Sequence, residues 1–253
     1  MKEKTVIVKN IETNYKIFGT GKPFLILHGW GSDSGKWKST AELLSQKNLC
    51  VIIPDLPGFG KSQQPESAWG LDNYVDWTLE LTQKIPELHN QFYLLGHSFG
   101  GALAAKFAIR HNQKVIKLFL CAAAAIRKKT IKKQVLRKVS KLAKIFHFLP
   151  FYPLARKAFY KFVVGVSDYL KVDGVMKETF LKGISDDLSQ KLSFIKLPVV
   201  ILWGDKDDTT SVEDAHWIHK KIFHSKLVII PGANHAPYLH VPEALSQNIL
   251  SNI

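Results

Sequence analysis

Short apolar runs that alternate with longer amphipathic stretches are the feature that most constrains how this chain can fold. Eight short apolar runs predict β-strands: TVIVKN, NYKIFG, PFLILHG, LCVIIPD, QFYLLG, VIKLFLC, PVVILWG and KLVIIPG. Helices are predicted near residues 37–46, 73–85, 99–110, 212–222 and 242–250. Several central runs are apolar at consecutive positions, which is typical of strands buried on both faces. We therefore expect an α/β fold: an eight-stranded, mostly parallel sheet with helices on both faces and an antiparallel start.

The alternation stops after the sixth run, where roughly seventy residues contain no further strand of the main sheet. Apolar residues at three- and four-residue steps predict helices there, including one over 172–184. We interpret 126–197 as a helical cap inserted after strand 6, and 1–125 with 198–253 as the core domain. A cap at this point would lie over the carboxyl ends of the strands, where open α/β sheets bind ligands.

The sequence Gly96-His97-Ser98-Phe99-Gly100 directly follows the fifth strand run and opens the helical stretch GALAAKFAIR. A G-x-S-x-G sequence in this setting is typical of a sharp strand-to-helix turn that exposes the serine hydroxyl. Side chains at the two glycine positions would collide in such a turn. Ser98 is therefore the candidate nucleophile.

A serine hydroxyl needs a base to accept its proton and an acid to orient that base. His235 follows the last strand run in PGANH, so it is expected at the same edge of the sheet as Ser98. Three aspartates follow the seventh run in LWGDKDD, and Asp207 is favoured as the acid, with Asp208 as the alternative. At least one of the three is expected to cap a helix or a turn instead.

The sequence His28-Gly29-Trp30-Gly31 ends the third strand run. Ester cleavage builds negative charge on the carbonyl oxygen, and the loss of one backbone donor to that oxygen typically costs ~10²–10³ in rate. We predict that the backbone N–H groups of Trp30 and Phe99 form this oxyanion hole; a simple tight turn is the alternative for this sequence. The candidate substrate-pocket residues are His28, Gly29, His97, Phe146, Phe151 and Tyr152. Aromatic residues at helical spacing in the cap are more often part of the cap's own core than of a pocket.

Four motifs in order, HGWG, DLPGFGKS over 55–62, GHSFGG, and GDKD with GANH, resemble those of the α/β-hydrolase superfamily over nearly the whole chain outside the cap. The resemblance selects Asp207 as the acid and implies an acyl-enzyme on Ser98, with no metal or organic cofactor. The chain is most similar to serine carboxylesterases, including pimeloyl-carrier-protein methyl ester esterases. In those esterases the sequence around the nucleophilic serine, called the nucleophile elbow, is GWSLG rather than the GHSFG of this chain. Dehalogenases and epoxide hydrolases of the superfamily use an aspartate nucleophile, and Ser98 is not one.

The formal charge of +14 is concentrated in one segment, because residues 127–161 hold twelve Lys or Arg and no Asp or Glu. A basic cap could dock an acidic carrier protein or an anionic membrane surface; a solvated helix face is the plainer interpretation. The stretch contains no recognised nucleic-acid-reading module, so no nucleic-acid partner is expected.

The principal hypothesis is a hydrolase of small-molecule esters or lactones. The alternatives are a hydrolase of carrier-linked acyl esters, a carbon–carbon bond hydrolase, and a non-catalytic binding protein of the same fold. The first residues lack a secretory signal pattern, no window approaches the ~18 apolar residues of a membrane span, and Cys50 and Cys121 end apolar runs as buried thiols would. A cytoplasmic location is therefore expected.

Overall fold

The computed structural model of the chain describes residues 1–127 and 174–253. Within these residues eight strands form one sheet in the order β1-β2-β4-β3-β5-β6-β7-β8. Their bounds are β1 Lys2–Val8, β2 Ile11–Phe18, β3 Lys22–Leu27, β4 Leu49–Pro54, β5 Phe92–His97, β6 Val115–Cys121, β7 Val199–Gly204 and β8 Ser225–Ile230. β2 pairs antiparallel with both β1 and β4, and the remaining neighbours are parallel. The predicted fold class is confirmed.

The first hairpin begins earlier than its sequence pattern suggested. β1 starts at Lys2 rather than at Thr5, and β2 starts at Ile11 rather than at Asn14. The two residues between them, Lys9 and Asn10, have φ angles of 48° and 61°, as a tight two-residue hairpin turn requires. Because most of β1 is exposed, charged residues occupy it, and an apolar pattern could not mark its start.

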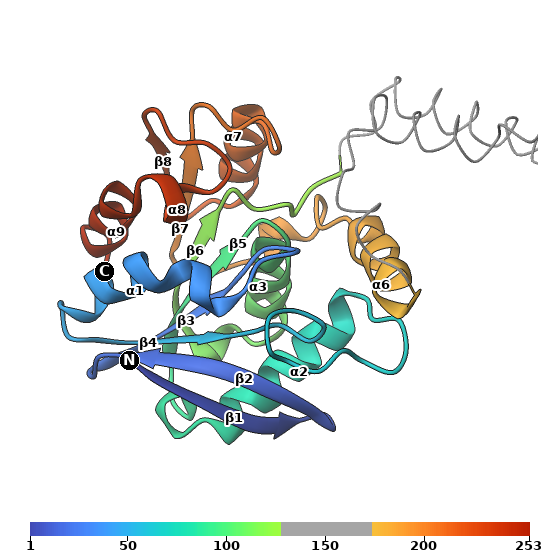
Figure 1. Cartoon of the computed structure of the whole chain (residues 1–253). Helices are drawn as coiled ribbons and strands as arrows, with labels where there is room; N and C mark the ends of the chain where they lie inside the picture. The colour runs from blue at the N-terminus through green and yellow to red at the C-terminus, as the bar shows by residue number, and fades with distance from the viewer. Residues whose placement is uncertain (128–173) are drawn as a thin grey trace, which may run out of the picture.

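Helices cover both faces of the sheet (Figure 1). Alternate residues of the central strands enter two separate apolar clusters, so Leu25 and Leu27 of β3 join one and Phe24 and Ile26 join the other. The first cluster includes residues of α2, α3 and α7, and the second includes residues of α1, α8 and α9. The described helices are α1 Lys38–Ser45, α2 Leu71–Lys84, α3 Phe99–Arg110, α6 Gly174–Ser185, α7 Val212–Lys221, α8 Pro237–His240 and α9 Pro242–Leu250, with 3-10 turns η1 Ser34–Trp37, η2 Pro86–Leu88, η3 Asn112–Lys114 and η7 Leu192–Phe194.

Of the proposed cap, residues 126–127 and 174–197 fall within the described residues. α6 covers nearly the range predicted for a helix at 172–184 and packs Met176 and Phe180 against the core. The predicted cap residues Phe146, Phe151 and Tyr152 lie outside the described residues. Among the helices that the structure describes, none combines the length and the apolar character needed to cross a bilayer.

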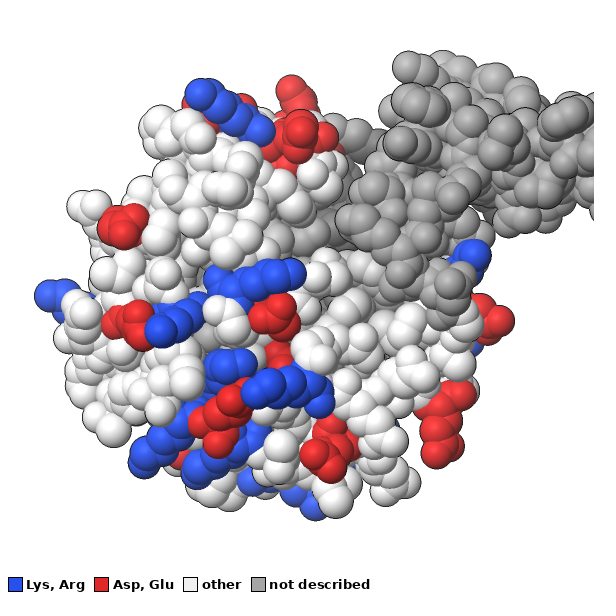
Figure 2. Space-filling model, viewed as in Figure 1, with Lys and Arg blue, Asp and Glu red and all other residues white. Residues whose placement is uncertain are grey.

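Most of the net charge belongs to sequence outside the described residues. Residues 128–173 contain twelve of the 35 Lys and Arg but two of the 21 Asp and Glu, which accounts for ten of the fourteen net positive charges. On the face drawn in Figure 2, the basic side chains of the described residues lie among acidic ones rather than in a uniformly basic patch. The described residues therefore form no uniformly basic surface on this face.

Candidate active site

Ser98 occupies a strained turn between β5 and α3. Its φ of 51° and ψ of −114° lie outside the regions that non-glycine residues favour. The Ser98 backbone N–H donates to the Cys121 carbonyl at 3.0 Å, which ties the turn to the end of β6. A Cβ at Gly96 would approach the Gly100 carbonyl oxygen to 2.2 Å, and one at Gly100 would approach the Leu27 carbonyl oxygen to 2.1 Å. Both glycines are therefore required by close backbone contacts.

His235 bridges Ser98 and Asp207. Its Nδ1 lies 2.8 Å from Asp207 Oδ2, and its Nε2 lies 3.1 Å from Ser98 Oγ. Because a carboxylate can only accept, the proton of a neutral His235 resides on Nδ1, and Nε2 is left to accept the Ser98 hydroxyl proton. The three side chains come from the ends of β5, β7 and β8, which meet at one edge of the parallel sheet.

Asp207 is held as a buried carboxylate. Its Oδ1 accepts the backbone N–H groups of Thr209 and Thr210, both at 2.9 Å, and its Oδ2 accepts the Thr210 hydroxyl at 2.8 Å. Burial raises its pKa, but the hydrogen bonds from His235 and Thr210 outweigh burial and bring the pKa below its usual value. Asp208, the sequence-level alternative, is exposed and contacts the Thr209 hydroxyl at 3.2 Å instead.

Thr210 is a site residue that sequence reasoning missed. Besides donating to Asp207, its hydroxyl oxygen lies 3.3 Å from His235 Nδ1. The Thr210 main chain is fixed in turn, because the indole N–H of Trp203 donates to its carbonyl at 2.9 Å. A threonine three residues after an aspartate is common at turns, so its position in the sequence gave no signal of this contact.

The two predicted oxyanion donors belong to residues next to the Ser98 turn: Phe99 follows Ser98 in the chain, and Trp30 follows Gly29, where a Cβ would lie 3.3 Å from Ser98 Cβ. Phe99 begins α3, so its amide has no partner inside the helix. In the described part of the chain, neither of these two amides donates a hydrogen bond. The Trp30 ring contacts the rings of Phe59, Phe99 and Phe180 at centroid distances of 4.8, 5.4 and 5.0 Å, all in edge-on geometry. Phe59 and Phe180 are further residues that sequence reasoning missed.

Two predicted pocket residues lie behind the site rather than on its surface. His28 is fully buried; its Nε2 accepts the Leu56 N–H at 2.9 Å, and its Nδ1 donates to the Gly29 carbonyl at 2.8 Å. Burial lowers the pKa of His28, which favours this neutral form. His97 is 3% exposed. Both rings are therefore buried rather than exposed to substrate, unlike the expected pocket residues. Gly29 packs between His97 and Ser98.

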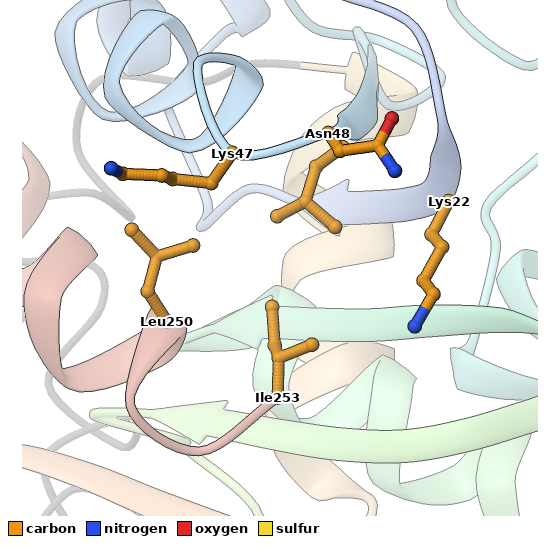
Figure 3. A pocket seen from close by; sticks show the side chains of 6 residues that line it. Lys22, Lys47, Asn48, Leu250 and Ile253 are labelled. Carbon is orange, nitrogen blue, oxygen red and sulfur yellow. The ribbon is translucent and has the colours of Figure 1, made fainter.

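A cavity of about 310 Å³ lies near the amino ends of β3 and β4. Lys22 begins β3 and Leu49 begins β4, whereas Ser98 follows the carboxyl end of β5. Figure 3 shows Lys22 and Lys47 on opposite sides of this cavity, with Leu250 beside Lys47 and Ile253 between the two lysines. The cavity is therefore separate from the candidate active site.

Within residues 1–127 and 174–253, no group of three or more His, Cys, Asp or Glu side chains could hold a metal ion. Cys50 and Cys121 are both buried free thiols. Burial raises the pKa of the Cys121 thiol, so this residue beside the elbow stays protonated.

A family model of the alpha/beta hydrolase fold matches residues 22–142. Lipase 1 of Psychrobacter immobilis is 24% identical over 90% of this chain and 75% of its own length. The pimeloyl-[acyl-carrier protein] methyl ester esterase of Nitrosomonas europaea is 26% identical over 89% of this chain and 93% of its own length. An esterase structure from Exiguobacterium antarcticum superposes with a TM-score of 0.76 at 22% identity, covering 99% of each chain. The chain therefore has the α/β-hydrolase fold.

Proposed function

We propose that this protein is a serine hydrolase that cleaves carboxylic esters, lactones included, through an acyl-enzyme on Ser98. The observation that carries the proposal is the unbroken line of hydrogen bonds from Ser98 Oγ through both nitrogens of His235 to Asp207. This arrangement supplies a nucleophile, a base and a buried anion in the order that ester cleavage uses them. The esterase and lipase relatives support the ester class.

In this mechanism Ser98 Oγ attacks the ester carbonyl carbon while His235 Nε2 takes the hydroxyl proton. Asp207 stabilises the resulting imidazolium by accepting from Nδ1, and the amides of Trp30 and Phe99 stabilise the oxyanion. Collapse of the tetrahedral intermediate breaks the bond to the alcohol oxygen, which receives the proton from Nε2. Water then attacks the acyl-enzyme by the same path, releasing the acid and restoring Ser98.

The direct test is turnover of p-nitrophenyl acetate and butyrate by wild type and Ser98→Ala, with fluorophosphonate labelling of the same two proteins. Loss of the nucleophile is expected to lower kcat by ~10³–10⁶ and to abolish labelling. Ser193→Ala, at an exposed serine outside the turn that carries Ser98, is the control. Full turnover by Ser98→Ala would contradict the proposal.

A panel of esters, lactones, thioesters and a vinylogous 1,5-diketone separates the bond classes. Ester or lactone turnover that depends on Ser98 is the expected result. Cleavage of the diketone with no turnover of any ester would replace the ester assignment by carbon–carbon bond hydrolysis. Labelling of Ser98 with no turnover of the whole panel would favour a substrate outside these classes.

A second candidate substrate is an acyl ester carried on an acidic protein. Two observations favour it: the relative that acts on a pimeloyl-[acyl-carrier protein] methyl ester, and the twelve uncompensated positive charges over 127–161. Attraction between exposed charges is screened over ~8–10 Å at physiological ionic strength, so kcat/KM for a carrier-linked ester should fall steeply with salt. The same ester without the carrier is the control, and equal salt dependence of the two would exclude carrier docking.

Membrane attachment is tested separately, by co-sedimentation of the protein with anionic vesicles.

A further inference from the structure

His97, the residue immediately before the proposed nucleophile, is fixed from several sides. It is the last residue of β5 and pairs with Cys121 of β6. Its ring contacts Tyr238 edge-on at a centroid distance of 4.9 Å and Trp37 at 5.9 Å. Trp37 and Tyr238 stack on each other at 4.2 Å with an interplanar angle of 10°. The imidazole therefore has little freedom to rotate.

The hydrogen bonds of His97 define its tautomer. Its Nε2 lies 2.7 Å from the main-chain carbonyl oxygen of His235. Because a carbonyl only accepts, Nε2 carries the proton and donates it. The other nitrogen, Nδ1, is buried and has no hydrogen-bond partner among the described residues. It faces Gly29, where a Cβ would approach Nδ1 to 2.8 Å, so the HGWG turn and the His97 ring fit against each other.

The segment that carries His235 needs such support. His235 lies between the end of β8 at Ile230 and the start of α8 at Pro237, in neither a strand nor a helix. Its imidazole must span two hydrogen bonds, of 3.1 Å to Ser98 and 2.8 Å to Asp207. A displacement of about 1 Å at a reacting group can cost ~10²-fold in rate. The carbonyl held by His97 belongs to the same residue as that imidazole.

We propose that His97 is a positioning residue that holds the His235 main chain, so that the His235 imidazole stays in reach of both Ser98 and Asp207. The inference rests on the proposed function. His97 acts from behind the site and does not touch the reacting atoms. Gly29 is part of this arrangement, because only a residue without a side chain leaves room for the His97 ring.

The neutral state of His97 suits this role. Burial, together with the nearby His235 and His28, lowers the pKa of His97 to about 3, although the hydrogen bond to the His235 carbonyl and the charge of Asp207 oppose the shift. The ring is therefore uncharged at neutral pH, with its centroid 5.0 Å from that of His235. A neutral donor can hold the His235 carbonyl without repelling the imidazolium that forms on His235 during turnover.

Two substitutions separate the hydrogen bond from the packing. In His97→Gln the side-chain amide nitrogen stands as many bonds from Cβ as Nε2 does, so the donor is retained without the ring. In His97→Phe a ring of similar size is retained without the donor. We expect His97→Phe to lower kcat for p-nitrophenyl butyrate by ~10–100-fold with KM within about threefold, and His97→Gln to recover much of that loss. His97→Asn, whose amide is one bond shorter, should resemble His97→Phe.

A second readout follows the histidine directly. The proton shared between His235 Nδ1 and Asp207 should give a far-downfield proton NMR signal in wild type and in His97→Gln, and a shifted or broadened signal in His97→Phe. If His97→Phe does not fold, the His97→Gln and His97→Asn pair provides the same comparison. Unchanged kcat and an unchanged signal in the variants without the donor would overturn the proposal, as would activity losses that only follow the folded fraction. Because the NMR signal requires no turnover, it tests His97 even if Ser98→Ala shows that the proposed function is wrong.

Discussion

Thr210 shows how a single hydroxyl can support the acid of the site. Its Oγ1 donates to the buried Oδ2 that also accepts from His235, so its removal leaves that oxygen with one donor fewer. Thr210→Val keeps the shape and deletes the hydrogen bond. Since a hydrogen bond to a charged group contributes ~1.5–3 kcal/mol, we expect kcat to fall about tenfold.

Thr209→Val is the matched control for that substitution. The Thr209 hydroxyl contacts the exposed Asp208, while its backbone N–H, which holds Asp207, is unaffected by the change. Steady-state kinetics of the two valine variants should therefore differ. Equal kcat values in both would show that the Thr210 hydroxyl does not support the acid.

The identity of the acid is tested by replacing each neighbouring aspartate in turn. In Asp207→Asn the amide can donate to Nδ1 of His235, which favours the wrong tautomer. Loss of the corresponding carboxylate in a serine protease costs ~10⁴ in kcat, so a loss of ~10³–10⁴ is expected here. Asp208→Asn should stay within about twofold, because Asp208 is exposed and does not contact His235. The reverse order of the two effects would assign Asp208 as the acid.

Sequence reasoning placed Ser98 and His235 because both follow strand runs, and the carboxyl ends of parallel strands meet at one edge. It could not identify Thr210 as a support or His97 as a buried donor, since those contacts depend on how two loops pack against each other. It also gave His28 a role in contacting substrate, whereas both nitrogens of His28 are used inside the protein.

Among the helices, a buried lysine joins α3 to α2 and to the segment that follows α6. Lys106 is 7% exposed, and its Nζ lies 2.5 Å from Asp186 Oδ2 and 2.9 Å from Asp72 Oδ1. Lys106→Met keeps the apolar stem and removes the charge. Loss of one partner of a buried pair costs ~3–5 kcal/mol, but both aspartates retain contact with water, so about 1–2 kcal/mol of unfolding free energy is expected.

Arg110→Met is the control for Lys106→Met. Arg110 lies one turn further along α3 and pairs with Asp72 and Asp76, but its side chain is 40% exposed. Exposed pairs contribute ~0–1 kcal/mol, so the loss in urea unfolding should be smaller than for Lys106→Met. An equal or larger loss for Arg110→Met would show that burial does not determine the strength of this connection.

α6 contributes Phe180 to the aromatic contacts around Trp30, whose backbone N–H is a proposed oxyanion donor. Phe180→Ala removes the ring that faces Trp30, and displacement of an oxyanion donor can cost up to ~10²–10³ in rate. Because only the ring contact is lost, we expect a smaller decrease in kcat for p-nitrophenyl butyrate, of about 3–30-fold. Leu181→Ala, at a residue 46% exposed on the same helix, should stay within twofold. Similar kcat values for the two variants would exclude a role of this contact in catalysis.

Elements with strong periodicity were predictable, and short ones were not. α3 and α9 have the predicted bounds, because an apolar helix face and a flanking turn mark each of them. α8, with four residues, is too short to show a period, although Pro237 at its first turn is a typical start signal. The predicted start of β1 was three residues too late, because the exposed first half of the strand has no apolar pattern.

For the whole molecule, the two buried histidines make stability depend on pH. His28 and His97 both have a pKa lowered by burial from the usual 6.5, and that of His97 falls to about 3. Below pH 6.5 the unfolded chain therefore binds protons that the folded chain does not, and the free energy of unfolding decreases as the pH falls. Asp207 and Asp55, whose pKa values are lowered from 3.8, add to this decrease only at more acidic pH.

The expected loss between pH 7.5 and pH 5.0 is up to about 2 kcal/mol for each buried histidine, since one pH unit corresponds to ~1.4 kcal/mol per proton. Urea unfolding of wild type, His97→Gln and His89→Gln at both pH values measures it. His97→Gln should show a smaller loss than wild type, because the substitution removes one of the histidines whose pKa burial lowers, a set that also includes His111. Substitution of the exposed His89 should leave the loss unchanged. The free energy of unfolding could instead decrease by the same amount in wild type and His97→Gln. His97 would then take up its proton in the folded state as readily as in the unfolded state. In that case the ring could not be the neutral donor that holds His235.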